Sequence, residues 1–218
     1  MPLVTIRGQL GSGAREIGIR VADLLGADYV DRQVIAEIAA RLHRGEQDVL
    51  EKEMPAGDLL GRIAEALGRT SPSGVDFEGA YLPIWQIPLD DARYLRTLES
   101  VIRDLARTPS LVIYGRGGQF ILRDDPRAFH VQAIAPLELR VKRVMEDLKL
   151  AREAARQEIA RFDSSGRKFI KRHFHAEVED ALHYDLVVNT GRLSFDAAAS
   201  IIVAALSARD KPEDTGGK

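Results

Sequence analysis

The stretch RGQLGSGAREIG, Arg7 to Gly18, separates two segments with different hydrophobic patterns. The apolar, β-branched run LVTI before it is typical of a buried strand, and the residues after it place apolar side chains at helical spacing as far as Gly26. The glycines at positions 8 and 13 have the spacing of a phosphate-binding loop, and that loop belongs between a first strand and a first helix. The alternative is a tight strand-to-helix turn that binds no ligand.

Two chemical groups of the usual phosphate loop are absent here. The lysine that contacts the terminal phosphates and the hydroxyl that holds Mg²⁺ are replaced by Ala14 and Arg15. Arg15 could supply the missing charge if its side chain turns inward, although a guanidinium cannot bind a metal ion. It could equally be a solvated arginine paired with Glu16. The candidate nucleotide-binding residues are therefore Gly8, Gly11, Ser12, Gly13, Ala14 and Arg15.

Composition excludes several classes of protein. The chain has 218 residues, a net charge of −2 and no cysteine, which rules out disulfides, cysteine-ligated metals and thiol catalysis. Nothing in the charge balance favours nucleic acid or a membrane surface. No signal peptide or membrane span is visible, so we expect a cytoplasmic protein.

Five short apolar segments alternate with helical patterns along the chain. The expected strands cover residues 3–6, 27–30, 110–115, 129–135 and 184–190. This alternation predicts an α/β fold with a parallel sheet covered on both faces. Residues 151–176 are expected to be helical and basic, with a break at DSSG (163–166). Residues 69–90 form a long loop with aromatic side chains, which could be a tethered linker, line a pocket or contact another copy in a homo-oligomer.

Several motifs together resemble the cytidylate kinase-like branch of the P-loop nucleoside monophosphate (NMP) kinases. The resemblance covers about 200 residues and rests on four stretches: TIRGQLGSGAREIG, ADYVDRQVI, LVIYGRGGQFIL and RHFHAEVEDALHYDLVVNTGRLSF. It implies a three-layer P-loop NTPase fold with a five-stranded parallel sheet. The single domain would span 1–208, with a core (1–30, 91–150, 184–208), a helical NMP-binding insertion (about 31–90) and a lid (about 151–180). The polar residues 209–218, which include proline and glycine, are expected to form a flexible tail.

The resemblance also implies an activity and residue roles. The activity is transfer of the ATP γ-phosphoryl group to a nucleoside monophosphate, CMP or dCMP first, with Mg²⁺. Asp31, Arg32 and Arg116 would bind the acceptor, although Asp31 could instead cap a helix and Arg116 could be a surface residue. Arg15 and lid arginines, Arg161 and Arg167 with Arg156 as a further candidate, would stabilise the transferring group, unless the lid arginines form only a solvated basic face.

The chain departs from the family pattern at several positions. Relatives often carry Asp-x-x-Arg in the lid, whereas Gly166 stands at the arginine position and Arg167 follows it. Tyr114 and Gly117 replace aspartates that flank the Gly-Arg pair, so no protein metal ligand is assigned. The alternative functions are therefore a nucleotide-binding regulator or pseudokinase without transfer activity, and a kinase for another small phosphate acceptor.

Overall fold

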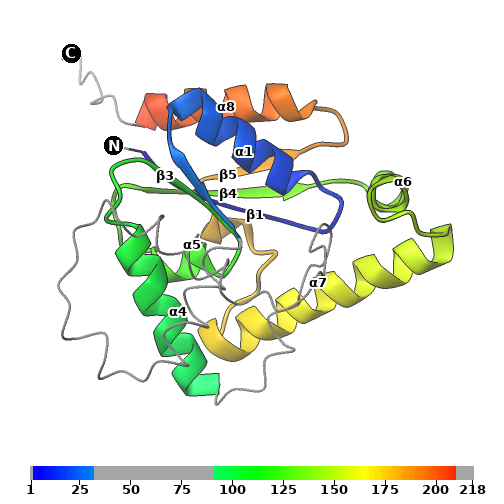
Figure 1. Ribbon diagram of the computed structural model, residues 1–218, viewed down its shortest axis with the longest axis horizontal. Helices are drawn as coiled ribbons and strands as arrows, with labels where there is room; N and C mark the ends of the chain where they lie inside the picture. The colour runs from blue at the N-terminus through cyan, green and yellow to red at the C-terminus, as the bar shows by residue number, and fades with distance from the viewer. Residues whose placement is uncertain (1, 32–90, 210–218) are drawn as a thin grey trace, which may run out of the picture.

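A parallel sheet with strand order β2-β3-β1-β4-β5 forms the centre of the molecule. The computed structural model describes residues 2–31 and 91–209 (Figure 1). The strands are β1 (Leu3–Gly8), β2 (Asp28–Val30), β3 (Leu111–Tyr114), β4 (Ala128–Ile134) and β5 (Leu186–Asn189). All five predicted strands are confirmed, with ends that differ by one or two residues. The insertion predicted at about 31–90 lies outside the described residues from residue 32 onward, and so does Arg32.

Helices cover both faces of this sheet. Figure 1 shows α1 (Ala14–Leu25) and α8 (Phe195–Arg209) on one face, and α4 (Asp91–Leu105), α5 (Gly118–Ile121) and α7 (Arg152–Phe174) on the other. Side chains of β1 alternate between the layers, because Val4 and Ile6 join the core under α1 and α8 whereas Leu3 joins the core under α4. Three layers in this order make the α/β architecture predicted from the sequence.

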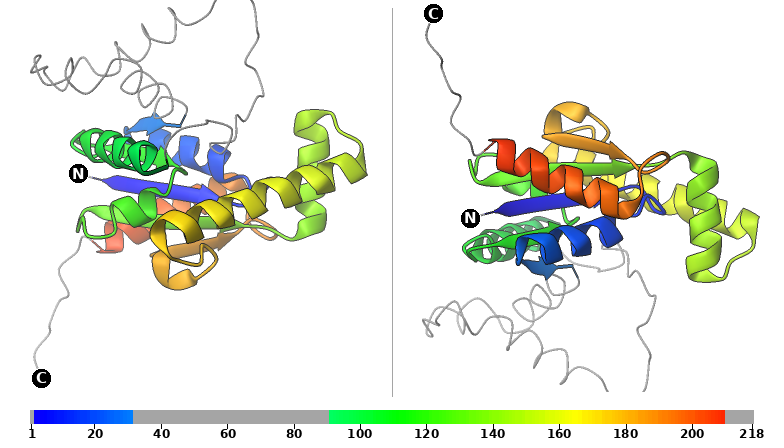
Figure 2. Two further views of the ribbon diagram at one scale, coloured as in Figure 1. Left: turned by 90° about the horizontal axis from the view of Figure 1, so that it is seen from below. Right: turned by 90° about the horizontal axis from the view of Figure 1, so that it is seen from above.

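Of the two remaining elements, only α6 lies at the carboxyl ends of the strands. Helix α6 (Leu137–Leu148) follows β4, and the 3₁₀ turn η3 (Ala181–His183) precedes β5. Figure 2 shows α6 and the first turns of α7 beyond the ends of the sheet. Ligands of open parallel sheets bind at this edge. Within residues 2–31 and 91–209, every helix is too short or too polar to cross a lipid bilayer.

The predicted helix break at DSSG is wrong. Helix α7 runs without interruption from Arg152 to Phe174. Its buried residues include Ile159, Asp163 and Ile170, which lie on one face at helical spacing on both sides of Gly166. Glycine costs about 1 kcal/mol in a helix relative to alanine. Burial of a continuous face outweighs this local preference.

Candidate functional site

The glycine-rich loop joins β1 to α1 at the carboxyl edge of the sheet. Strand β1 extends past its predicted end because Arg7 and Gly8 pair with β4. Gly13 then begins α1 with a left-handed φ of 82°, and a Cβ there would lie 2.1 Å from the Phe195 ring. No side chain caps this helix start. The first amide groups of α1 are thus left to a ligand or solvent, at the positive end of the helix dipole.

Side chains from outside the loop hold its backbone in one orientation. Three consecutive carbonyls accept hydrogen bonds: Leu10 O from Arg140 Nη1 (3.3 Å), Gly11 O from Arg143 Nη1 (3.1 Å) and Ser12 O from Thr190 Oγ1 (2.7 Å). In a trans peptide the N–H group points opposite to the carbonyl. The amides of Gly11 and Gly13 therefore face away from these partners, which makes the loop a preorganised set of donors for an anion.

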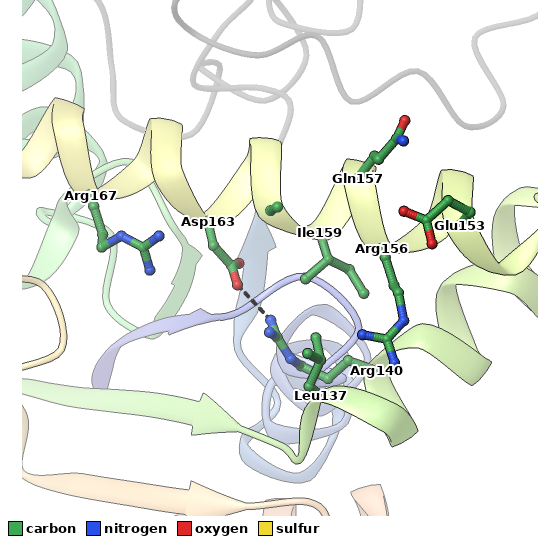
Figure 3. A pocket seen from close by; sticks show the side chains of 9 residues that line it. Leu137, Arg140, Glu153, Arg156, Gln157, Ile159, Asp163 and Arg167 are labelled. Atoms are coloured by element: carbon green, nitrogen blue, oxygen red, sulfur yellow. Dashed lines mark hydrogen bonds and ion pairs between the residues drawn. The ribbon is translucent and has the colours of Figure 1, made fainter.

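A buried ion pair fixes α7 to the same loop. Arg140 Nη1 lies 2.7 Å from Asp163 Oδ2, and the two side chains are 7% and 10% exposed. Asp163 Oδ1 also accepts a hydrogen bond from Leu10 N at 3.2 Å. Asp163 thus joins the loop backbone to an arginine of α6, and Figure 3 shows the pair meeting between the two helices.

Next to this pair is a basic pocket of about 470 Å³. Arg140, Arg156 and Arg167 line it together with Glu153 and Gln157 (Figure 3). Arg140 Nε is buried without a hydrogen-bond partner. Arginine and carboxylate side chains therefore line the same pocket between α6 and α7.

Arg143 connects three parts of the site. Its guanidinium donates to Thr190 Oγ1 (2.9 Å) and Thr190 O (3.1 Å), in addition to the loop carbonyl. It also lies 4.8 Å from the centre of the Phe195 ring, close enough for a cation–π contact. Burial lowers the pKa of Arg143, with the charges of Glu16 and Asp147 opposing the shift. Arginine is still charged at neutral pH, so this side chain keeps a positive charge behind the loop.

The structure brings together two residues predicted for different subsites. Arg15 Nε lies 3.4 Å from Asp31 Oδ2, with side chains 41% and 12% exposed. Arg15 projects from the first turn of α1, whereas Asp31 follows β2. The cation predicted for the donor site and the carboxylate predicted for the acceptor site are therefore neighbours. The helix that Asp31 would cap lies outside the described part of the chain.

Arg116 occupies a strained turn between β3 and α5. Gly115, Arg116 and Gly117 have φ values of 73°, 59° and 70°, and the Gly115 amide donates to Ile6 O at 2.8 Å. A left-handed conformation is uncommon for a residue with a side chain and occurs often at functional sites. Since β3 is next to β1, the half-buried Arg116 lies at the same edge as the phosphate loop.

The three candidate arginines of α7 all pair with carboxylates. Arg161 contacts Glu158 (2.7 Å), Arg167 contacts Glu179 (3.2 Å), and Arg156 contacts Glu138. These side chains are one third to one half exposed. Such exposed pairs exchange partners at little cost. The structure thus places Arg156 and Arg167 at the pocket and Arg161 in a local contact along the helix.

The family model for the Cytidylate kinase-like family matches residues 3–192. The chain belongs to the Cytidylate kinase-like family. Cytidylate kinases of Natronomonas pharaonis and Methanothrix thermoacetophila are 22% and 25% identical to it, over 98% and 94% of this chain and 94% and 98% of theirs.

Solved structures agree on the fold of this member of the family. An uncharacterized protein from Eubacterium ventriosum matches with a TM-score of 0.67 and 15% identity, covering 95% of this chain and 99% of its own. Shikimate kinase from Acinetobacter baumannii matches with a TM-score of 0.50 and 16% identity, covering 97% and 96%. The three-layer P-loop fold is thereby established, and the family supports a kinase that acts on a nucleotide or another small molecule.

P-loop kinases generally use ATP with Mg²⁺. The amides of Gly11 and Gly13, which face away from the groups that bind the loop carbonyls, are donors of the kind that the phosphates of a nucleotide need. Within residues 2–31 and 91–209, no three carboxylates or histidines gather as metal ligands. Mg²⁺ bound by nucleotide phosphates needs only one or two protein carboxylates. Asp31 is a carboxylate at this edge of the sheet, so a metal carried by the nucleotide is compatible with the site.

Sequence reasoning missed the residues that hold the loop. Arg140 and Arg143 are three apart in the helix that begins after Pro136, and that spacing places both on one face. The sequence pattern predicts a helix break at Asp163 and the end of a strand at Thr190, and neither prediction gives these side chains a role at the loop. The sequence signal for this role was the spacing of Arg140 and Arg143 on one face of the helix that follows β4. Their target, the loop carbonyls, is more than a hundred residues away.

Proposed function

We propose that the protein transfers the γ-phosphoryl group of ATP to a nucleoside monophosphate, with CMP or dCMP as the first acceptors. The observation that carries this proposal is the loop backbone, whose carbonyls are bound from behind by Arg140, Arg143 and Thr190. Such a loop presents its amides to an anion before any ligand arrives. Family membership and the cytidylate kinase relatives favour a nucleotide as that anion.

Two groups of residues divide the work of transfer. Loop amides bind the donor's phosphates, and Arg116 with Asp31 binds and orients the acceptor. A phosphate oxygen of the monophosphate forms a bond to the γ-phosphorus while the bond from that phosphorus to the ADP oxygen breaks. The products are ADP and a nucleoside diphosphate. Positioning and positive charge account for most of the catalysis in such reactions, since negative charge spreads over the moving group.

Helix α7 acts in this proposal as part of the lid. Arg161 and Arg167 would leave Glu158 and Glu179 and turn toward the phosphates when the lid closes. The exposure of these pairs makes the exchange inexpensive. Closure would also exclude water, which strengthens each charge contact.

A coupled assay for ADP tests the activity. Purified protein is given ATP–Mg²⁺ with CMP, dCMP, UMP or AMP, and we expect the highest kcat/KM for CMP or dCMP. In Arg116→Asn, the acceptor KM should rise by about tenfold or more, because a charge-assisted contact worth about 1.5–3 kcal/mol is lost. Asparagine tolerates the left-handed backbone. The KM for ATP serves as the internal control and should stay unchanged.

A second function, nucleotide binding without transfer, is favoured by Ala14, which stands at the lysine position of the usual phosphate loop, and by Tyr114, which stands at an aspartate position of the family pattern. Calorimetry distinguishes the two. Heat of nucleotide binding by folded protein that turns over none of the four acceptors would select the regulator and contradict the kinase.

A further inference from the structure

Helix α7 carries a glycine, Gly166, beside the side chain of Arg7 near the end of β1. A Cβ built on Gly166 would lie 3.9 Å from Arg7 Nη2. Gly166 is also the position at which the resemblance expects a lid arginine. The guanidinium of Arg7 therefore reaches the lid helix at the point where that arginine is missing.

Arg7 is held in this direction by the fold. It pairs with Gln132 of β4 and directly precedes Gly8, the first glycine of the phosphate loop. Alternation along β1 places it on the same face as Leu3, toward α7. Strand β1 lies between β3, which ends at the Arg116 turn, and β4. Arg7 thus stands between the proposed donor and acceptor sites.

Two neutral groups hold the guanidinium in place. Arg7 Nη1 donates to Val178 O at 3.3 Å, and the Tyr184 hydroxyl donates to the same carbonyl at 2.7 Å. Burial raises the pKa of the Tyr184 hydroxyl, and the nearby charge of Arg7 opposes that shift. The guanidinium is therefore positioned without being neutralised.

The charge environment of Arg7 differs from that of the α7 arginines. Arg161 and Arg167 each have a carboxylate partner, and so does the buried Arg140. No carboxylate of residues 2–31 or 91–209 lies within ion-pair distance of Arg7, although its side chain is half-buried. Partial burial of an unneutralised charge is unfavourable, and an incoming anion relieves that cost.

We propose that Arg7 contacts the transferring phosphoryl group and replaces the lid arginine missing at Gly166. The proposal rests on the proposed kinase function. During transfer, Nη2 donates to an equatorial oxygen of the phosphoryl group as the bond to ADP breaks and the bond to the acceptor oxygen forms. Arg7 stays protonated throughout, so no proton moves through it.

The main variant is Arg7→Gln, which keeps a donor for Val178 O and removes the charge. We expect kcat to fall at least about 100-fold, since arginines at transferring phosphoryl groups contribute about 10³–10⁵ in rate. Both nucleotide KM values should change by less than about threefold, because the contact forms in the transition state. The kcat of Arg7→Lys should fall less than that of Arg7→Gln, because lysine keeps the positive charge.

Rescue by a second substitution separates catalysis from structure. Gly166→Arg in the Arg7→Gln background restores the guanidinium from the lid side, and we expect it to recover at least about tenfold in kcat. Tyr184→Phe is the comparison variant, because it removes another hydrogen bond to Val178 O and leaves the Arg7 charge in place. Its kcat should fall by less than that of Arg7→Gln, since the guanidinium is still present.

Each result supports or overturns the proposal. Native kcat in Arg7→Gln overturns it, and so does an equal loss in Tyr184→Phe, which would show that the shared carbonyl is what matters. If Arg7→Gln fails to fold by circular dichroism, Arg7→Lys decides: a lower kcat at unchanged KM supports the proposal, and a KM effect alone overturns it. Native protein without turnover defeats the kinase function itself, whereas native turnover with unaffected Arg7 variants defeats this proposal alone.

Discussion

Two ion pairs on helix α7 show how differently one helix can use its charges. Asp163 pairs with Arg140 where both side chains are at least 90% buried, and it also accepts the Leu10 amide of the phosphate loop. Two residues earlier, Arg161 pairs with Glu158 on the exposed side. The buried pair fixes a backbone in position because neither charge can return to water. The exposed pair does not fix the backbone in one position, because Arg161 can exchange Glu158 for water or for a ligand at little cost in free energy.

The largest effect is expected for Asp163→Ala. This substitution leaves the Arg140 charge buried without its partner and the Leu10 amide without its acceptor. Breaking such a pair costs about 3–5 kcal/mol, to be measured as the free energy of unfolding in urea. The double variant Asp163→Leu with Arg140→Met should cost less than the two single substitutions combined. Additive costs would contradict a coupled pair.

Gly13→Ala tests the start of the loop helix. Its Cβ would lie 2.1 Å from the Phe195 ring at a φ of 82°. Overpacking costs about 1–3 kcal/mol, and the left-handed backbone adds about 1–2 kcal/mol. Gly26→Ala is the control, since its φ is 57° and nothing lies within 4 Å. Urea unfolding should show a larger decrease in the free energy of unfolding for Gly13→Ala than for Gly26→Ala. Equal decreases would mean that the Phe195 ring moves aside at no cost in stability.

A smaller effect is expected from pH at His130, which is half-buried within the sheet. Its Nδ1 lies 2.7 Å from Thr5 Oγ1. Burial lowers the pKa of His130, with the charge of Asp185 opposing the shift. The unfolded chain therefore takes up a proton before the folded one as pH falls below about 6.5, and stability decreases there.

His130→Gln removes this titration. Between about pH 7.5 and about pH 5.5, the native chain should lose more unfolding free energy than the variant, by at most about 1.4 kcal/mol per pH unit. Above about pH 7.5 the two should change in parallel. If the unfolding free energies of the native chain and the variant also change in parallel below about pH 6.5, groups other than His130 cause the loss of stability in acid.

The smallest effect is expected for Arg161→Ala. Removal of one exposed partner should lower the free energy of unfolding by less than about 1 kcal/mol. If the arginine contacts phosphates in the closed state, the same variant lowers kcat, and the coupled assay measures this at unchanged stability. A stability loss as large as that of Asp163→Ala would remove the distinction between the two pairs.

Local patterns predicted some parts of the site well and others poorly. The glycine spacing from Gly8 to Gly13 and the five strands were readable, because hydrophobic periodicity and turn composition act over a few residues. The break at 163–166 was wrong because the burial of Asp163 outweighs the low helix propensity of the serines and the glycine around it. The partnership of Arg15 with Asp31 could not be foreseen, since β2 separates them in sequence while the sheet edge brings them together.

The sequence alone determined the order of elements, the parallel sheet and a glycine loop at the start of the first helix. In contrast, the contacts of Arg140, Arg143 and Thr190 with the loop carbonyls, and the position of Arg7 opposite Gly166, become visible only in the folded chain. Strands and turns follow from the chemistry of neighbouring residues. The approach of Arg7 to Gly166 and the contact of Arg140 with the loop depend on how α6 and α7 pack against the edge of the sheet, and side-chain packing at long sequence separation sets that packing angle.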